Sequence, residues 1–330
     1  MLTGVIIFTK WVIEIIYIHI KDMKYSLRQL EVFVAIARHE NVSRAAAEVS
    51  LSQSAASTAL GELERQFATQ LFDRAGKSLR LNELGRVLLP KAIELLERAG
   101  EIEAMLAGHA GVGPLAIGAT LTIGNYLATL IVADFLRQYP VSRVRLTVHN
   151  TATIIDAVAR FDLDIGLVEG ACRHPDLVAE PWVEDELVVF CAPGHPLAER
   201  GQASVEQLVA QPWILREPGS GTRATLDSAL RDFHGRLDVR LELEHTEAIK
   251  RAVESGLGIG CISGLALREA FRRGSLVPLR TPELDLRRQF HFVRQRQKFE
   301  TAGMREFVAC CRALTAGVQR TADIVLPYIP

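Results

Sequence analysis

The sequence carries almost no net charge and little cysteine. Lysine and arginine number 38 against 39 aspartates and glutamates, so any surface for nucleic acid must be a local patch. The five cysteines form no C-x-x-C pair and have no histidine at zinc-finger spacing. This pattern speaks against a disulfide framework and a zinc finger, fits reduced thiols in a cytoplasmic protein, and predicts neither a metal nor a bound cofactor.

The chain also lacks a long, uninterrupted hydrophobic run. The apolar stretch from Val5 to Ile20 contains Lys10 and Glu14, falls short of about 18 residues, and is followed by no small-residue cleavage pattern. It therefore predicts neither a membrane span nor a signal peptide. Because Met23 opens the segment in which the first regular helix begins, we interpret residues 1–22 as an extension ahead of the domain; a short added helix or strand is the alternative.

Recognisable catalytic motifs are missing too. The sequence has no G-x-S-x-G, no H-E-x-x-H and no Walker loop, so no residue is assigned a catalytic role and the chain is not expected to be an enzyme. What is present is 330 residues that are 48% hydrophobic and 23% charged. That composition is typical of a soluble chain with two or three compact domains.

The first part of the chain predicts three short helices. Apolar residues recur at helical spacing from Leu27 to about Arg38, a second helix runs from Arg44 to Val49, and a third follows the N-cap Ser52 to about Phe67. Two helices joined by so tight a turn form a helix-turn-helix.

A hairpin and a long helix are expected next. The segment from Leu71 to Leu81 predicts a hairpin that turns at Gly76, the wing of the domain. Asn82 then caps a long helix whose apolar residues step by three and four, the spacing of a seam between two helices. This seam predicts a dimer through Leu88, Ala92, Leu95, Ala99, Ile102 and Leu106. The glycines after it are interpreted as a linker.

From Pro114 onward, short apolar strands alternate with helices. Strands are expected at 115–119, 144–148, 164–168, 187–192, 239–243, 259–262 and 286–293, with helices at 124–138, from 154, at 247–254 and at 302–314. Such alternation predicts parallel α/β units, here in two lobes.

These segments together resemble a known family. The runs Leu27–Phe33, Ala45-Ala46, Ser52–Ser57, Leu63-Glu64, Leu71–Arg74 and Glu83–Gly85 resemble the LysR-type winged helix-turn-helix almost position for position. The resemblance covers about residues 26–314. It implies an α/β multidomain protein with a winged helix-turn-helix, a long linker helix and a two-lobed effector domain of the type II periplasmic-binding-protein fold. Thr58 departs from the basic residue common in relatives, so base contacts are expected to depend more on polar side chains.

The expected domain boundaries follow from this organisation. They are an extension at 1–22, the winged helix-turn-helix at 23–82, the linker and dimerisation helix at 83–112, the effector domain at 113–314 and a tail at 315–330. Within the effector domain, lobe 1 comprises about 113–185 and 287–314, and lobe 2 about 186–286.

DNA contacts are expected from the third helix and the wing. The early residues of a helix that enters the major groove must hydrogen-bond to bases or phosphates, and a basic hairpin can reach the phosphate backbone. The segment from Arg65 to Arg80 carries four positive residues and one acid. The predicted DNA-binding residues are Arg44, Ser52, Gln53, Ser54, Ser57, Thr58, Arg74, Lys77 and Arg80, although a polar helix that is merely solvated would look the same in isolation.

Two segments of the second half fit an anion. The segment 215–223 is a glycine-rich turn with hydroxyls just before a helical stretch, and Thr120 and Thr122 lie at the end of the first strand of lobe 1. Each alone is more often an ordinary turn and cap. Together they predict an effector site of Thr120, Thr122, Asn150, Thr151, Ser220, Gly221, Thr222 and Glu247. Glu169 is expected nearby, where a carboxylate disfavours an anion unless it accepts a donor.

Among relatives, these stretches look closest to regulators of sulfur assimilation and carbon fixation. The resemblance thus implies sulfite, sulfate, or a small carboxylate or phosphoester as effector, and double-stranded promoter DNA and a second copy of the chain, as dimer or tetramer, as partners. A redox switch of Cys191 and Cys261 is an alternative, and buried free thiols are the common outcome. A periplasmic solute-binding protein, the rival with the same two-lobed fold, would need a signal peptide and would not need the helix-turn-helix.

Overall fold

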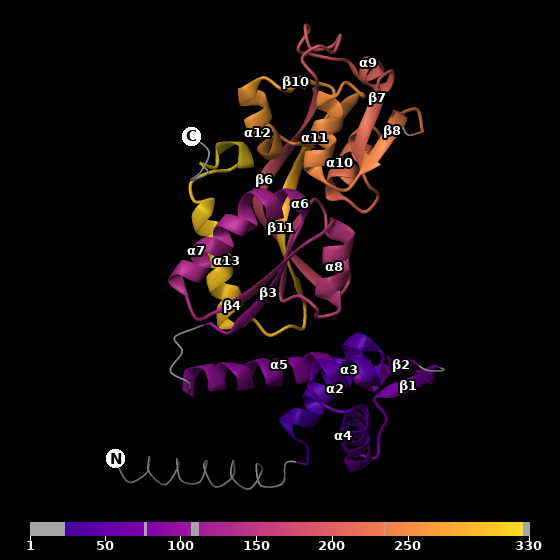
Figure 1. Ribbon diagram of the computed structural model, residues 1–330, viewed down its shortest axis with the longest axis vertical. Coiled ribbons are helices and arrows are strands. Elements are labelled where there is room, and N and C mark those ends of the chain that lie inside the picture. Colours follow the sequence, from indigo (N-terminus) through magenta and orange to yellow (C-terminus); the bar gives the residue numbers. More distant parts are fainter. Residues whose placement is uncertain (1–23, 76–77, 107–111, 234, 326–330) are drawn as a thin grey trace. The chain divides into compact units, whose positions relative to one another are not determined.

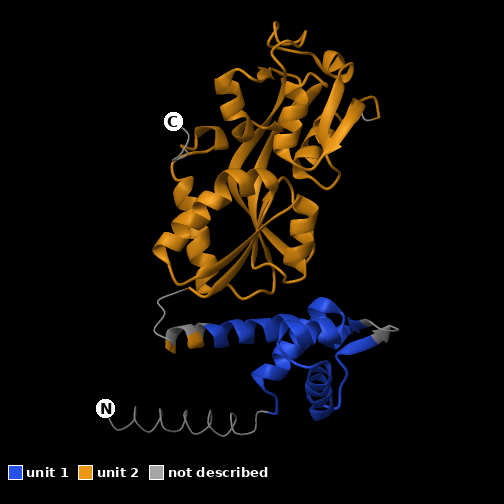
Figure 2. Cartoon of the chain, viewed as in Figure 1, with its two compact units in different colours: residues 1–100 blue, residues 101–330 orange. Residues whose placement is uncertain are grey.

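A computed structural model describes residues 24–75, 78–106, 112–233 and 235–325. The chain divides into two compact units, residues 1–100 and 101–330, which are described separately (Figure 2). The predicted extension at 1–22 lies outside the described residues, as do Gly76, Lys77 and residues 107–111 of the predicted linker.

The first unit begins with the three predicted helices, which the structure confirms as α2 (Leu27–His39), α3 (Val42–Glu48) and α4 (Gln53–Gln66). A side chain caps each of them: Ser26 forms a capping box on α2, Asn41 caps α3, and Ser52 accepts from the backbone N–H of Ala55. Ala45 and Ala46 are buried where α3 packs between its neighbours. Their small side chains let helices joined by a tight turn approach closely.

The wing is a hairpin of β1 (Phe72–Ala75) and β2 (Ser78–Leu81), paired antiparallel. Glu64 on α4 fixes its start, because its carboxylate accepts a hydrogen bond of 2.7 Å from the backbone N–H of Leu71. Asn82 caps α5 (Glu83–Leu106) through the N–H of Gly85, as expected. A Cβ on Gly85 would lie 2.2 Å from the carbonyl oxygen of Leu71, so only glycine allows α5 to pass this close to the wing.

Helix α5 only partly offers the predicted dimer seam. Ala92 is buried in the core of the first unit, and Leu88 and Leu95 pack against the same core. These three positions therefore serve the domain itself, because the apolar stripe of α5 must also cover α2 and α4. Ile102 and Leu106, further along the helix, expose 57% and 81% of their surface.

The second unit consists of two lobes (Figure 1). Lobe 1 has parallel strands β3 (Pro114–Ala119), β4 (Arg143–Val148) and β5 (Ile165–Glu169), joined antiparallel by β11 (Arg287–Gln295). Its helical segments cover both faces of the sheet, α8 on one and the others opposite. They are α6 (Leu121–Ile123), a π-helical turn η1 (Gly124–Ala128), α7 (Thr129–Gln138), α8 (Thr151–Ala159) and α13 (Ala302–Leu314).

Lobe 2 repeats this layering. Its strands are the end of β6 (Leu177–Cys191), β7 (Pro212–Arg216), β8 (Asp238–Leu243), β9 (Ile259–Ser263) and β10 (Val277–Leu279). Helices α9 (Val205–Val209) and α10 (Gly221–Ala229) cover one face, and α11 (Thr246–Glu254) and α12 (Gly264–Arg273) the other. A short turn of 3-10 helix, η2 (Arg231–Phe233), follows α10.

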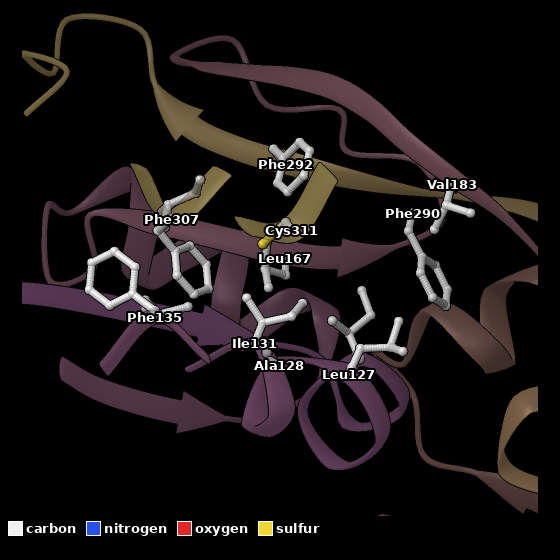
Figure 3. Packing of buried hydrophobic residues seen from close by; sticks show 14 of the residues in the cluster. Leu127, Ala128, Ile131, Phe135, Leu167, Val183, Phe290, Phe292, Phe307 and Cys311 are labelled. Carbon is white, nitrogen blue, oxygen red and sulfur yellow. The ribbon is translucent and has the colours of Figure 1, made fainter. Parts of the chain in front are cut away.

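Strand β6 connects the two lobes. Its first part pairs with β11 in lobe 1, and residues 187–191 pair with β9 and β10 in lobe 2. The strand order β4-β3-β5-β11-β6-β9-β7-β8 therefore runs continuously through both lobes. Figure 3 shows the lobe 1 core, in which Phe135 and Phe307 meet edge to face while Leu167, Phe292 and Phe290 continue the apolar layer to their right.

Several segments differ from the sequence-based expectation. The helix expected at 124–138 already begins at Leu121, and the helix expected from 154 begins at Thr151. Strand β6 begins ten residues before the predicted strand at 187–192. The pattern of short apolar runs did not predict this first part, because charged side chains interrupt its apolar residues. The predicted tail is no separate segment up to Val325: Thr321 and Ile324 are buried, and η3 (Thr321–Asp323) packs against β6 and α12.

None of the helices described is long and apolar enough to cross a membrane.

Candidate DNA-binding surface and effector site

The polar residues at the start of α4 lie on one exposed face. Ala56, Leu60 and Leu63 turn into the core of the unit. Gln53, Ser54, Ala55, Ser57 and Thr58 in the first two turns are exposed. A helix with this division can enter the major groove with its first turns while its apolar stripe keeps it attached to the domain.

The other predicted DNA-binding residues are placed less uniformly. Arg44 is exposed at the start of α3, and Arg80 is exposed on β2. The Ser52 hydroxyl caps α4 and lies 3.0 Å from the Ser54 hydroxyl, so in this structure it stabilises the start of the helix. Arg74 belongs to β1, and Lys77 lies outside the described residues.

In the second unit, the two lobes meet around a buried carboxylate. Glu169, at the end of β5, is 1% exposed. One of its oxygens accepts from the backbone N–H of Thr122 in lobe 1 at 2.8 Å, and the other from the hydroxyl of Thr222 in lobe 2 at 3.2 Å. The donors predicted to bind an anion therefore hold an anion that the chain itself supplies.

Arg288 completes this cluster from β11. Its Nη1 donates to Glu169 at 2.8 Å and to the Thr222 hydroxyl at 2.9 Å. Burial alone would raise the pKa of Glu169, but the charge of Arg288 and the hydrogen bonds from Thr122 lower it below its usual value. Glu169 is therefore ionised at neutral pH, which resolves why an acid lies among anion-binding groups.

A second buried acid continues the network across the hinge. Asp185 on β6 accepts from Nε of Arg288 at 2.7 Å, from the Ser263 hydroxyl at 2.7 Å and from the Thr321 hydroxyl at 2.6 Å. The Glu169 position is thus connected through Arg288 and Asp185 to the N-cap of α12 and to the C-terminal turn.

The other predicted residues around the cleft serve partly structural roles. The Thr120 hydroxyl lies 3.4 Å from the carbonyl oxygen of Leu167, and Asn150 caps α8. The Thr151 hydroxyl accepts from the N–H of Gly221 at 3.1 Å across the lobes. Gly221 is required there, because a Cβ would lie 2.2 Å from the carbonyl oxygen of Glu169.

Glu247 bridges the lobes away from this cluster. It accepts a hydrogen bond of 2.6 Å from the hydroxyl of Tyr126 in lobe 1 and pairs with Lys250 in its own helix. Burial and the Glu247 carboxylate raise the pKa of Tyr126, so the phenol stays protonated and always donates. Glu247 is better described as part of a lobe contact than as part of an anion site.

Sequence reasoning missed Arg288 and Asp185. Both lie inside strand segments that otherwise alternate with buried apolar residues. A charged residue at a buried strand position was the available signal, because such charges must pair. Their partners, however, come from elements that lie far apart in the chain.

Cys191 and Cys261 lie in the core of lobe 2. Burial raises their pKa values to about 11 and about 12. In the β6–β9 register, Cys261 is opposite Val189, so the two cysteines are offset by two residues along the strands. The five cysteines are all free, and the buried pair resembles ordinary core thiols.

Comparison with known proteins matches both units to one family. The profile of the "Bacterial regulatory helix-turn-helix protein, lysR family" matches residues 27–86, and that of the "LysR substrate binding domain" matches residues 109–316. The chain is 43% identical over 289 residues to the HTH-type transcriptional regulator YeiE of Escherichia coli K12, covering 88% of this chain and 98% of that protein. It is 33% identical over 291 residues to the RuBisCO operon transcriptional regulator of Allochromatium vinosum, covering 87% and 96%.

Solved structures agree on the fold. The regulatory domain of CcmR from Synechocystis PCC6803 aligns with a TM-score of 0.58 and 28% identity, covering 62% of this chain and 98% of that one. Full-length OxyR from Pseudomonas aeruginosa, solved as a point variant, aligns with a TM-score of 0.65 and 20% identity, covering 87% and 93%. The curated relatives above are named as transcriptional regulators and not as enzymes. The chain therefore belongs to the LysR family and is a DNA-binding transcriptional regulator with an effector-binding domain.

Proposed function

We propose that a small anion regulates promoter binding by entering the cluster of Thr122, Thr222 and Arg288 in place of the Glu169 carboxylate. The observation that carries this proposal is that donors from α6 in lobe 1, α10 in lobe 2 and strand β11 converge on one buried carboxylate. An ion with several oxygens can use the same donors once Glu169 has turned away. Sulfite, sulfate, a small carboxylate or a small phosphoester has the required charge.

The comparisons support a small-molecule effector in general. The regulatory domain of CcmR was solved in complex with 2-PG, and that domain is 28% identical to this chain. The relatives also include regulators of RuBisCO operons and the HTH-type regulator CysL of Bacillus subtilis, which is 29% identical over 266 residues.

Regulation requires the anion to bind one arrangement of the lobes more tightly than another. Because the cluster joins both lobes and the hinge strands, exchange of a tethered carboxylate for a free ion changes the contacts that hold the lobes together. In the proposed mechanism this change alters the spacing of two DNA-binding heads in a dimer or tetramer, and so the bend of the promoter. The protein then acts on double-stranded DNA in the cytoplasm.

Footprinting of the chain's own upstream intergenic DNA tests the proposal. We expect protection at low salt, and a shift of the protected region with one of sulfite, sulfate or a small organic anion. Thr222→Val removes one donor, so the shift should need about tenfold more anion. Thr153→Val, which changes an exposed threonine on α8, is the matched control and should behave like the wild type.

The outcomes separate the parts of the proposal. Absence of protection at low salt would contradict promoter binding at this sequence. Protection that no anion alters, or an anion response equal in the Thr222 variant and the wild type, would overturn the assignment of the effector site.

A further inference from the structure

A large cavity adjoins the Glu169 cluster but is built mostly from other residues. Its volume is about 1030 Å³, and its walls come from the loop after β5, one side of α10, and the start of β11. Thr122 and Thr222, which hold the Glu169 carboxylate, are not part of the lining. The volume is at the upper end of pockets that hold metabolite-sized molecules and far exceeds what sulfate needs.

The charge of the cavity wall is positive. Five arginines line it against three carboxylates. Arg223 pairs with Asp227, Arg287 with Asp285, and Arg288 with the buried acids of the hinge, so three of the five are neutralised. The charges of Arg173 and Arg231 are not neutralised, because neither arginine forms an ion pair with any residue that the structure describes.

Arg231 is held in position without being neutralised. Its guanidinium donates to the carbonyl oxygen and to the hydroxyl of Ser228, both at 3.2 Å. These contacts fix the side chain beside the cavity and leave its full charge for another partner. A guanidinium in a defined orientation suits the oxygens of phosphate.

Ser220 supplies a hydrogen-bonding group that no protein atom uses. The residue lines the cavity, is 2% exposed, and its Oγ has no hydrogen-bond partner. It is the N-cap residue of α10, yet its side chain does not make the capping bond that serine usually makes there. The Thr151 hydroxyl receives the N–H of Gly221 instead, which leaves the Ser220 hydroxyl for a ligand.

His291 lies on the same wall. Its Nδ1 is buried and forms no hydrogen bond of good geometry, although the backbone of Gln289 and of Gly170 interacts with the ring. Burial lowers the pKa of the ring, so the ring is uncharged at neutral pH. The unpaired group that points to a missing partner is therefore the Ser220 hydroxyl, because native structures leave few buried polar atoms unpaired.

We propose that this cavity is a second ligand site, which binds an organic phosphate through Arg173, Arg231 and the Ser220 hydroxyl. A phosphate monoester carries nearly two negative charges at neutral pH and matches the two uncompensated arginines, whereas one carboxylate leaves one of them unpaired. The remaining volume holds the organic part of the ligand. Glu169 and Arg288 belong both to the cavity wall and to the small-anion cluster, so the two positions adjoin, but Arg173, Arg231 and the Ser220 hydroxyl hold no part of the Glu169 carboxylate.

Calorimetric titration of the full chain tests this site. The probes are 3-phosphoglycerate, ribose 5-phosphate, glycerate, succinate and sulfate. We expect at least one of the two phosphate esters to bind once per chain, and glycerate, succinate and sulfate to bind at least tenfold more weakly. Arg231→Gln and Ser220→Ala should each weaken the phosphate ester about tenfold or more. Arg200→Gln, at an exposed arginine outside the cavity, should leave it unchanged.

Two readouts separate this site from the proposed function and from loss of folding. Thr222→Val should weaken the small anion in footprinting and leave the phosphate ester unaffected. Ser220→Ala removes a hydroxyl that bonds to nothing in the protein, so the unfolding midpoint without ligand should not fall. The proposal is overturned if neither phosphate ester binds, if succinate binds equally well, or if the Arg231 and Ser220 variants bind like the wild type.

Discussion

The carboxylate of Glu169 and the guanidinium of Arg288, on neighbouring strands of lobe 1, meet at 2.8 Å where Thr222 of lobe 2 reaches them, and both side chains are at least 98% shielded from solvent. A charge in such a place is tolerated only when it is paired and hydrogen-bonded. The pair therefore depends on the hydrogen bonds that Thr122 and Thr222 add from the two lobes, and it occupies the position proposed for an effector anion.

Replacement of Glu169 should destabilise the effector domain. Glu169→Gln leaves Arg288 with Asp185 as its only acidic partner, so we expect the free energy of unfolding to fall by about 3 kcal/mol. Urea unfolding followed by tryptophan fluorescence measures this, because Trp182 and Trp213 lie in this unit. Glu180→Gln breaks an exposed ion pair with Arg312 and should cost less than about 1 kcal/mol. Equal losses in the two variants would contradict the importance of the buried pair.

The same pair predicts a pH dependence. The pKa of Glu169 is lowered in the folded protein, so its stabilising contribution is present above the unfolded pKa of about 4.3 and is lost as the pH falls through the folded value. The difference in unfolding free energy between the wild type and Glu169→Gln should thus stay constant between about pH 6 and pH 8 and shrink below about pH 4. A difference that grows in acid would mean that the folded pKa is raised.

The exposed part of α5 predicts a dimer contact. Leu95 packs against the core of its own unit, so a charge there would disturb folding as well as association. Ile102→Asp is the cleaner change, because this side chain is 57% exposed within the chain. We expect a lower mass in sedimentation at unchanged helicity, with Glu103→Ser as the control. An unchanged mass would remove Ile102 from the dimer seam.

Gln53 should contact base edges and so determine sequence preference, whereas Arg44 should contact the phosphate backbone. Gln53→Ala should reduce the preference between bases at one position by about 1–3 kcal/mol. Arg44→Ala should weaken binding to all sequences similarly and lower the salt slope by about one. Binding assays over a series of salt concentrations and operator variants measure both effects, and Gln66→Ala at the exposed end of α4 is the control. The assignment of Gln53 fails if its variant keeps the wild-type base preference.

The buried cysteines should resist modification. With pKa values of about 11 and 12, Cys191 and Cys261 are almost fully protonated at neutral pH. In the native protein, iodoacetamide should therefore label the half-buried Cys172 and Cys310 first, and mild peroxide should leave DNA binding unchanged. Rapid formation of a disulfide between Cys191 and Cys261 would restore the redox alternative.

Local sequence determined the secondary structure and the family. The caps Ser52 and Asn82, the apolar spacing of α2 and α4, and the alternation of strands and helices after Pro114 are all signals between residues close in the chain. For that reason the helix at 302–314 and the strand at 259–262 could be predicted almost to the residue. The polar face of α4 followed from the same periodicity.

Tertiary structure alone decided which polar residues meet. Thr122, Glu169, Thr222 and Arg288 come from four elements separated by up to 166 residues, and no local pattern relates them. Likewise, the spacing of Ala92 fits a seam with another helix, yet the residue packs into its own domain, because periodicity defines a face of a helix and not its partner. The sequence thus determined which side chains were available, and the packing of the two lobes decided that a carboxylate of the chain would occupy the site predicted for an anion.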